Sequence, residues 1–256
     1  MSTDRGLNGK TAIITGASRG IGLAIAQDLV AHGARVCITA RRPEPLEEAA
    51  AGFPEGSVIA VAGRSDDPEH RREVLDTVAD TFGGLDILVN NAGINPVYGP
   101  LAELDLDAAR KVFEVNVLGT LAWVQDAVHH SGLDFRGRGG TVVNLSSVTG
   151  DTPSPGIGLY GISKAAVSHL TRTLAVELGP EIRVNAVSPA LVKTKFAQAL
   201  YEGKEDEVTR DYPLGRLGTP EDIASAVTYL SSPDSAWMTG QVLTLDGGLL
   251  AAGGRA

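Results

Sequence analysis

Short apolar runs recur along the chain and alternate with longer segments in which apolar residues follow helical spacing. The runs are continuous and often β-branched, which is typical of strands buried on both faces of a parallel sheet. Because strands that alternate with helices need crossover connections, the pattern predicts an α/β fold. We expect a doubly wound, seven-stranded parallel sheet with helices on both faces. The predicted strands lie at residues 10–15, 35–40, 57–62, 85–90, 141–145, 183–187 and 242–245.

The segments between these runs predict helices. One follows a glycine-rich turn, and another, rich in Glu and Ala, precedes the third strand. No linker, low-complexity tract or repeat divides the chain, so residues 1–256 are expected to form one domain. The remaining helices are expected at residues 108–128, 160–178 and 220–231.

The composition excludes several classes of function. The net charge is −9 and there is no Lys- or Arg-rich run, which argues against nucleic acid or an anionic membrane as a partner. The single cysteine, Cys37, excludes an internal disulfide, and the histidines lack zinc-ligand spacing, so no metal is expected. The polar N-terminus and the lack of any apolar run near about 18 residues predict no signal peptide, no membrane span and a cytoplasmic location.

A glycine-rich turn with the spacing Gly-x-x-x-Gly-x-Gly follows the first expected strand and opens the first expected helix. Glycines let a backbone approach a pyrophosphate closely, and a helix N-terminus supplies unpaired amides and a partial positive charge. Glycines at such a junction can also serve packing alone, but this context favours dinucleotide binding. The expected contacts are Gly16, Ser18, Arg19, Ile21 and Gly22.

The end of the second expected strand distinguishes between the two nicotinamide dinucleotides. An acidic residue there would bind the ribose hydroxyls of NAD, whereas arginine can bind the 2′-phosphate of NADP. The chain has Ala40-Arg41-Arg42, with no carboxylate before Glu44, and Arg19 can reach the same group. These arginines can also be ordinary surface residues. The stretch favours NADP(H), with Arg41 as a phosphate contact.

Tyr160 and Lys164 are four residues apart on an expected helix and therefore share one face. A phenol has a pKa near about 10 and is a poor acid or base at neutral pH. A cation about 4 Å away, at an effective dielectric near 20, contributes roughly 4 kcal/mol, which would lower that pKa by roughly three units. The spacing also arises by chance on many helices, so the pair gains meaning only from its surroundings.

Several short motifs occur together and in order along nearly the whole chain. They are residues 15–22, Asn90-Asn91-Ala92-Gly93, Asn116, Asn144-Leu145-Ser146-Ser147, residues 160–164, residues 188–194 and Leu245-Asp246-Gly247-Gly248. In this combination the chain resembles the short-chain dehydrogenase/reductase family, notably its branch of 3-oxoacyl-carrier-protein reductases and small ketone reductases. The resemblance implies a single-domain Rossmann fold and hydride transfer with a nicotinamide cofactor.

The resemblance also implies roles for four residues. Tyr160 would be the general acid that protonates the alkoxide in carbonyl reduction, and Lys164 would hold the nicotinamide ribose and lower the pKa of Tyr160. Ser147 would hydrogen-bond the substrate carbonyl, and Ser146 is expected to point the opposite way. Asn116 would anchor a water that leads protons to Lys164, although the alternative is a helix-interior asparagine satisfied by backbone groups.

Three further residues are implied as cofactor contacts: Asn91 for the adenosine ribose, and Val192 and Thr194 for the nicotinamide amide and the pyrophosphate. Asp246 is interpreted as a structural turn residue. The ligand site as a whole is expected at the carboxyl ends of the strands.

The chain departs from the family pattern at two places. The family often has Asp-Val at the end of the third strand, where this chain has Arg64-Ser65, so no acidic adenine contact is expected. Arg64 is interpreted as an exposed loop residue rather than a ligand contact. The family's Pro-Gly after the sixth strand is Pro189-Ala190 here, and the extended loop at residues 132–140 is expected to lie away from the chemistry.

Three segments are expected to surround the substrate: residues 94–100, 148–159 and 193–213, the last with the length and polarity of a mobile lid. An apolar pocket favours a hydrophobic ketone or acyl chain, although the same residues can equally pack their own loops. Acidic residues in the lid argue mildly against an acidic carrier protein as a partner. The apolar residues are Val97, Tyr98, Ile157, Phe196, Leu200 and Tyr201.

The sequence is therefore interpreted as an NADPH-dependent reductase of a ketone or 3-oxoacyl group, with Tyr160 as general acid or base. The alternative, a catalytically silent regulatory or scaffold protein that binds a dinucleotide, is disfavoured because all four implied catalytic residues are present. The helices at residues 108–128 and 160–178 carry more apolar surface than one buried face needs, including Trp123. Family members commonly pair these helices across subunits, so the resemblance implies a homodimer or homotetramer.

Overall fold

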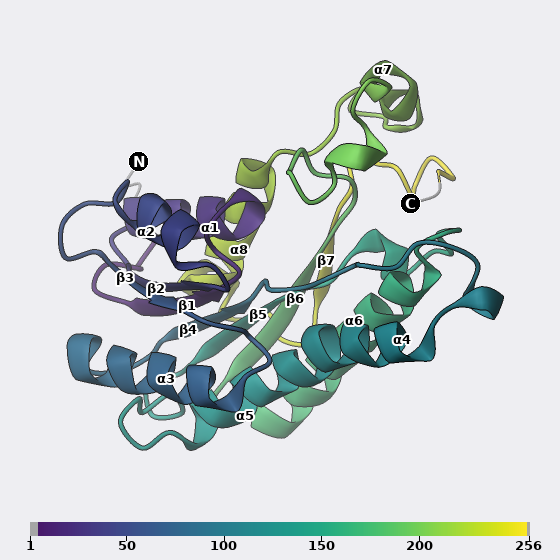
Figure 1. Cartoon of the computed structure of the whole chain (residues 1–256). Coiled ribbons are helices and arrows are strands. Elements are labelled where there is room, and N and C mark those ends of the chain that lie inside the picture. The colour runs from purple at the N-terminus through teal and green to yellow at the C-terminus, as the bar shows by residue number, and fades with distance from the viewer. Residues whose placement is uncertain (1–4, 255–256) are drawn as a thin grey trace.

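The computed structural model describes residues 5–254 and shows one parallel sheet between two layers of helices (Figure 1). The sheet has the order β3-β2-β1-β4-β5-β6-β7, so the chain starts in the middle, runs to one edge and returns beside β1. This is the order of a doubly wound Rossmann fold, and it confirms the expected fold class. The strands are β1 (Thr11–Thr15), β2 (Arg35–Ala40), β3 (Val58–Ala62), β4 (Ile87–Asn90), β5 (Thr141–Leu145), β6 (Arg183–Pro189) and β7 (Val242–Leu245).

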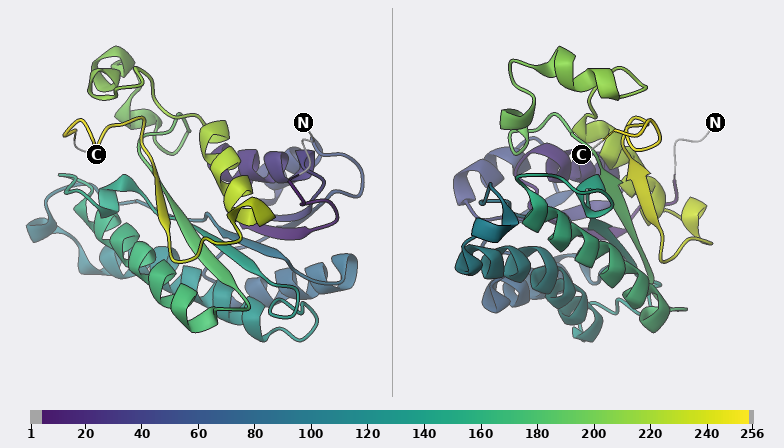
Figure 2. Two further views of the ribbon diagram at one scale, coloured as in Figure 1. Left: turned by 180° about the vertical axis from the view of Figure 1, so that it is seen from behind. Right: turned by 90° about the vertical axis from the view of Figure 1, so that its right-hand side faces the viewer.

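Helices cover both faces of the sheet (Figures 1 and 2). One layer contains α1 (Gly20–Ala31), α2 (Pro43–Ala50) and α8 (Pro220–Ser231). The other contains α3 (Pro68–Phe82), α5 (Gly119–His129) and α6 (Gly158–Leu178), and α4 (Leu106–Phe113) extends it. The short helix α7 (Glu205–Val208) belongs to the lid segment, residues 193–213, which stands away from the sheet in both views of Figure 2. Within residues 5–254, no helix has the length and apolar character needed to cross a membrane.

The strands are apolar because the sheet is buried on both faces. In β1, Ile14 packs in the core formed with α1 and α8, while its neighbour Ile13 packs in the opposite core with α3 and α5. Both side chains are 0% exposed. A strand in this position has no solvated face, so its sequence is a continuous apolar run.

All seven strands lie where the sequence predicts them, with ends that differ by at most two residues. Helix α3 was not expected. Its start is nevertheless marked, because the Asp67 side chain accepts a hydrogen bond from the backbone N–H of Glu69 (3.0 Å) and Pro68 occupies the first position. Gly83 ends the helix in the left-handed region, with φ of 75°. These signals lie in a polar segment whose apolar face is narrow.

The helix expected at residues 108–128 is two helices, α4 and α5, joined by the π-helical turn Glu114–Leu118. Asn116 lies inside this turn and is 1% exposed. Turns of this kind are rare and occur mostly at functional sites. Trp123 does not add to the exposed apolar surface as expected: it is 1% exposed, and its indole N–H donates to the backbone oxygen (3.1 Å) and hydroxyl (2.8 Å) of Ser65.

The amino ends of the strands carry a buried group of ion pairs. Asp86 is 4% exposed and accepts hydrogen bonds from Lys10 Nζ (2.9 Å), from the Arg138 guanidinium (2.8 Å) and from the backbone N–H of Thr11 (2.9 Å). These donors hold the pKa of Asp86 below its usual value despite the opposing effect of burial. Arg138 belongs to the loop at residues 132–140, which lies at this edge and away from the carboxyl ends, as expected.

Candidate active site

The glycine-rich turn packs directly onto the segment that follows β4. Gly16 has φ of 68°, and a Cβ at Gly22 would lie 2.5 Å from Asn91 Nδ2 and 2.6 Å from the Gly16 carbonyl oxygen. Any larger residue at position 22 would therefore push the turn and the segment apart. The turn can approach a ligand closely only because these positions carry no side chain. The residues that the sequence predicts as cofactor contacts here all lie in this turn or at the start of α1: Gly16, Ser18, Arg19, Ile21 and Gly22.

Asn91 holds this turn in place. Its side-chain amide donates to the backbone oxygens of Thr15 (2.8 Å) and Gly16 (3.0 Å), and the Thr15 hydroxyl accepts from the backbone N–H of Asn91 (3.0 Å). Both amide hydrogens of Asn91 are thus used within the protein. The side chain supports the turn from beneath, and the ribose contact that the resemblance implies for Asn91 stays a prediction.

The base of the lid segment lies against the start of α1. A Cβ at Gly20 would meet the Thr194 methyl group at 3.4 Å, so Thr194 faces the helix N-terminus. Val192 is 4% exposed and pairs with Gly218 in a parallel bridge, which fixes the chain just before Thr194. The backbone amides at the start of α1 and the Thr194 hydroxyl therefore fit a pyrophosphate between them.

The arginines expected at the adenosine end differ in their availability. Arg19 and Arg41 are exposed, and within residues 5–254 neither guanidinium forms an ion pair or a side-chain hydrogen bond. The Ala17 backbone N–H donates to the Thr39 backbone oxygen (3.0 Å), which ties the glycine turn to the end of β2. Arg64 is instead paired with Asp66 at 2.9 Å. The two unpaired guanidiniums fit a phosphate, and Arg64 is the exposed loop residue that the sequence predicts.

Tyr160 and Lys164 lie in the first turns of α6, beside the carboxyl end of β5. Lys164 is 4% exposed; its Nζ donates to the Leu145 backbone oxygen (2.7 Å) and lies 5.4 Å from the centre of the Tyr160 ring. A Cβ at Gly93 would lie 3.5 Å from Lys164 Nζ and 3.5 Å from Asn116 Oδ1. The backbone after β4 therefore lies close to both groups.

Burial shifts the pKa values of this pair in opposite directions. It lowers the pKa of Lys164 to about 8. It raises the pKa of Tyr160 above its ordinary value, and the neighbouring phenol of Tyr98 adds to this shift. The expectation that Lys164 lowers the pKa of Tyr160 is wrong for the protein by itself. The Lys164 ammonium donates its hydrogen bond to the Leu145 carbonyl, and the loss of hydration of the phenolate determines the pKa of Tyr160. The Tyr160 phenol therefore carries its proton at neutral pH.

Ser146 and Ser147 point to opposite sides after β5, as the alternation of strand residues predicts. Ser146 Oγ donates to the Lys164 backbone oxygen (2.9 Å) and hydrogen-bonds the Ser168 hydroxyl (2.7 Å), so it fastens β5 to α6. Ser147 is 9% exposed, and its Oγ accepts from the backbone N–H (3.3 Å) and the hydroxyl (3.0 Å) of Thr149. Sequence reasoning did not single out Thr149.

Asn116 connects the segment after β4 to α6. Its Oδ1 accepts from the backbone N–H of Ile94 (2.8 Å), and its Nδ2 donates to the Ile94 backbone oxygen (3.0 Å) and the Ser163 hydroxyl (3.1 Å). Both amide hydrogens are satisfied by protein groups. The side chain thus bonds backbone groups of Ile94 and the Ser163 hydroxyl, and the water-anchoring role that the resemblance implies stays a prediction.

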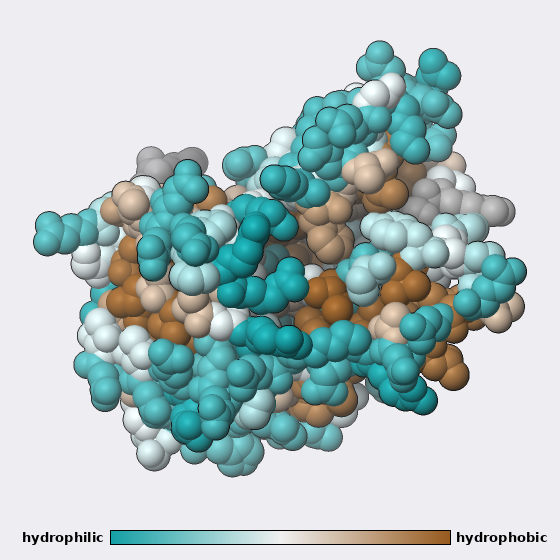
Figure 3. Space-filling view, viewed as in Figure 1, coloured by the Kyte–Doolittle hydropathy of each residue, from teal (hydrophilic) through white to brown (hydrophobic). Residues whose placement is uncertain are grey.

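Aromatic residues from two segments lie beside Tyr160. The ring of Phe196, in the lid segment, is centred 6.2 Å from that of Tyr160, and Tyr98 adds its phenol from the segment after β4. Phe196 is 53% exposed and Tyr98 63% exposed. Figure 3 shows a hollow between the lid segment and the body of the molecule, with apolar residues along its wall. Exposed aromatic side chains therefore lie beside Tyr160, where the sequence predicts an apolar pocket.

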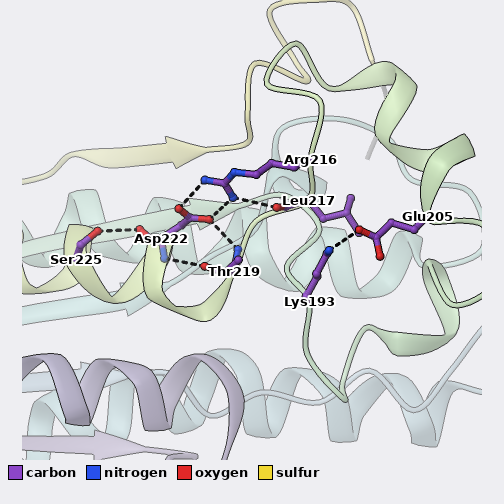
Figure 4. A network of polar contacts seen from close by, with 7 residues as sticks. All are labelled: Lys193, Glu205, Arg216, Leu217, Thr219, Asp222 and Ser225. Carbon is purple, nitrogen blue, oxygen red and sulfur yellow. Dashed lines mark hydrogen bonds and ion pairs between the residues drawn. The ribbon is translucent and has the colours of Figure 1, made fainter.

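Figure 4 shows polar contacts within the lid segment and just beyond its end. Lys193 forms an ion pair with Glu205, which joins the start of the segment to α7. Beyond its end, Arg216 donates to both carboxylate oxygens of Asp222 (2.6 and 2.9 Å), and Thr219 caps α8. Arg216 lowers the pKa of Asp222 to about 2, so this pair stays charged at any ordinary pH.

Asp246 lies in the turn that follows β7. Asp246 accepts hydrogen bonds from the backbone N–H groups of Gly248 and Leu250 (both 2.9 Å), so it is the turn residue that the sequence predicts. Within residues 5–254, no group of three or more His, Cys, Asp or Glu residues is placed to hold a metal ion.

The fold brings the glycine-rich turn and the side chains of Ser147, Tyr160 and Lys164 to the carboxyl ends of the strands. The family profile described as "Enoyl-(Acyl carrier protein) reductase" matches residues 16–250. The chain belongs to the short-chain dehydrogenase/reductase family, whose members use nicotinamide dinucleotides, and it is an oxidoreductase that acts on CH–OH groups and the corresponding carbonyls.

Similar proteins from several organisms share nearly the whole chain. Dehydrogenase/reductase SDR family member 4 of Caenorhabditis elegans is 38% identical over 259 residues, which cover 98% of each chain. Tropinone reductase-like 3 of Erythroxylum coca is 34% identical and covers 95% of this chain and 94% of its own. A short-chain dehydrogenase/reductase structure from Brucella melitensis, titled glucose/ribitol dehydrogenase, superposes with a TM-score of 0.88 at 30% identity, covering 94% of this chain and 97% of its own.

Proposed function

We propose that the protein is an NADPH-dependent carbonyl reductase that acts on small or medium-sized hydrophobic ketones. The observation that carries this proposal is a protonated Tyr160 that lies beside exposed aromatic side chains and on the same helix as the buried Lys164. A phenol that keeps its proton is suited to donate it to a carbonyl oxygen as that oxygen becomes negative.

Each residue of the site has a defined task in this reaction. Ser147 donates its hydroxyl hydrogen to the carbonyl oxygen and so places the carbonyl carbon. The reduced nicotinamide, when bound, supplies the hydride to that carbon. Tyr160 gives its proton to the oxygen, which completes the alcohol. Lys164, with a pKa of about 8, holds the ribose hydroxyls and can return a proton to Tyr160 near neutral pH.

The choice of NADPH over NADH rests on the end of β2. Arg41 directly follows β2, and its exposed guanidinium has no ion-pair partner within residues 5–254, as is also true of Arg19. No carboxylate lies between the end of β2 and Glu44, so this stretch does not repel a 2′-phosphate. Two free guanidiniums are the groups that recognise such a phosphate.

The hydrophobic ketone is favoured over a 3-oxoacyl group on a carrier protein. The exposed aromatic rings at Tyr160 offer apolar surface to the substrate. The lid segment instead carries Glu202, Glu205, Asp206 and Glu207, which would repel an acidic carrier protein.

Exposed apolar residues on the outer helices support a homodimer or homotetramer in solution. Leu106 on α4 is 66% exposed, and Ile162 on α6 is 48% exposed. Leu118 lies between them in sequence, in the π-helical turn, and is 53% exposed. Light scattering coupled to size exclusion measures the assembly directly, and a monomer at micromolar concentration would contradict this part of the proposal.

The test is a panel of aliphatic and aromatic ketones, assayed with NADPH and with NADH by absorbance of the reduced nicotinamide. We expect turnover with NADPH and a higher KM for NADH. Tyr160→Phe should keep NADPH binding and lose nearly all turnover, whereas Tyr229→Phe on α8 should match the wild type. Binding of NADPH without turnover of any ketone would contradict the reductase, and full activity of Tyr160→Phe would show that another group donates the proton.

A further inference from the structure

The Ser147 hydroxyl has an unusual set of partners. Its oxygen accepts two hydrogen bonds, both from Thr149: one from the backbone N–H at 3.3 Å and one from the hydroxyl at 3.0 Å. A serine hydroxyl has two lone pairs and one hydrogen. When both lone pairs receive donors from one side, the remaining hydrogen must point away from Thr149. The Ser147 hydrogen is therefore oriented before a substrate arrives.

Thr149 is itself held firmly against the helix that carries Tyr160. It lies in the 3₁₀ turn Val148–Gly150, which packs on the start of α6. A Cβ at Gly161, the residue after Tyr160, would overlap the Thr149 carbonyl oxygen. A Cβ at Gly150 would lie 2.7 Å from the backbone nitrogen of Ala165. The turn and the helix thus meet backbone to backbone, and the two hydroxyls of Ser147 and Tyr160 share one rigid support.

The backbone hydrogen bond alone explains the start of the turn, because a serine side chain commonly caps the N–H two residues later. The second bond, from the Thr149 hydroxyl, adds nothing to that cap. Its effect falls on Ser147: it fills the other lone pair and, by polarising the oxygen, makes the Ser147 hydrogen a better donor. This hydroxyl therefore has a role beyond local structure.

We infer that Thr149 is a positioning residue that aims the Ser147 hydroxyl at the substrate carbonyl oxygen. This inference rests on the proposed carbonyl reduction. In that reaction Ser147 must donate, and a hydroxyl free to rotate would spend part of its time directed elsewhere. Donation by Thr149 leaves Ser147 with a single useful direction for its hydrogen.

The test is Thr149→Val, which keeps the shape of the side chain and removes only its hydroxyl. We expect kcat for ketone reduction to fall about tenfold, with the Kd of NADPH and the melting temperature close to wild type. Thr149→Ser restores the hydroxyl and should recover most of the rate. Thr77→Val on α3 removes a hydroxyl that donates only to the Glu73 backbone oxygen, outside the site; it is the matched control and should leave kcat unchanged.

A double-mutant cycle separates positioning from a general structural effect. In a Ser147→Ala background, assayed at high enzyme concentration, Thr149→Val should have no further effect, because the group it positions is gone. A full additional loss in that background, or wild-type kcat for Thr149→Val, would overturn the inference while the reductase stands. A wild-type protein that binds NADPH but turns over no ketone would instead overturn the proposed function and the inference with it.

Discussion

Burial of Lys164 should make the protein less stable at neutral pH than it would be with an apolar residue there. Folding lowers the pKa of this lysine from 10.5 to about 8, which corresponds to a free-energy cost of about 3 kcal/mol for the charged form. The cost is fully present below pH 8 and disappears as the pH rises toward the pKa of the unfolded chain. Lys164→Met removes it at every pH, and also leaves the Leu145 carbonyl without its donor.

The two effects of this substitution have different pH dependence. Loss of the donor to Leu145 costs about 1–3 kcal/mol and does not change with pH. The advantage gained by removing the charge should shrink by about 2 kcal/mol between pH 7 and pH 10. We therefore expect the stability of Lys164→Met, relative to the parent protein, to fall by that amount over this range.

The measurement is urea unfolding of the cofactor-free protein at several pH values, followed by tryptophan fluorescence and circular dichroism. Both proteins should carry Tyr160→Phe, so that the neighbouring phenol does not titrate in the same range. The difference between the two unfolding free energies cancels the pH dependence of all other groups. A difference that stays constant from pH 7 to pH 10 would refute the argument, because it would mean that Lys164 keeps its ordinary pKa in the folded protein.

Two further substitutions test the cofactor site and the base of the sheet. Arg41→Asp should raise the KM for NADPH at least tenfold and lower that for NADH, and an unchanged preference in steady-state kinetics would exclude Arg41 as the phosphate contact. Asp86→Ala removes the buried acceptor of the Thr11 backbone N–H and the partner of the partly exposed Lys10 and Arg138. It should lower the unfolding free energy, measured in urea, by about 1–3 kcal/mol. Asp76→Ala breaks only an exposed pair and is the control; an equal loss in both variants would contradict this reasoning.

The sheet could be predicted from the sequence because its strands are buried on both faces. The ends of β2, β5 and β7 are those that the apolar runs indicate, since each run stops where a polar residue or a glycine begins. Helix α3 was missed because its capping signals, at Asp67 and Gly83, flank a segment with few apolar residues. The spacing of apolar residues along a helix reflects the face that the helix buries. The helical pattern is therefore weak where the buried face is narrow.

The site was predicted less completely, because several roles depend on the direction of a single polar atom. Spacing places Lys164 next to Tyr160, but only the structure shows that its ammonium faces the Leu145 carbonyl and that burial controls both pKa values. The Asn90-Asn91-Ala92-Gly93 motif does not indicate that the Asn91 side-chain amide donates hydrogen bonds to the glycine-rich turn. Thr149 gave no signal of its own, because its effect on Ser147 requires the turn between them.

The π-helical turn Glu114–Leu118 makes chain length, and not only residue type, a determinant of the active site. Each residue of a regular helix advances the side chains by about 100°. Removing one residue here would rotate Asn116 and Trp123 relative to each other by that angle. The helix could then keep Asn116 on Ile94 or Trp123 on Ser65, but not both. A one-residue deletion at this point would therefore break either the Asn116 contacts at the active site or the Trp123 hydrogen bonds to the β3–α3 loop. The segment would still form a regular helix.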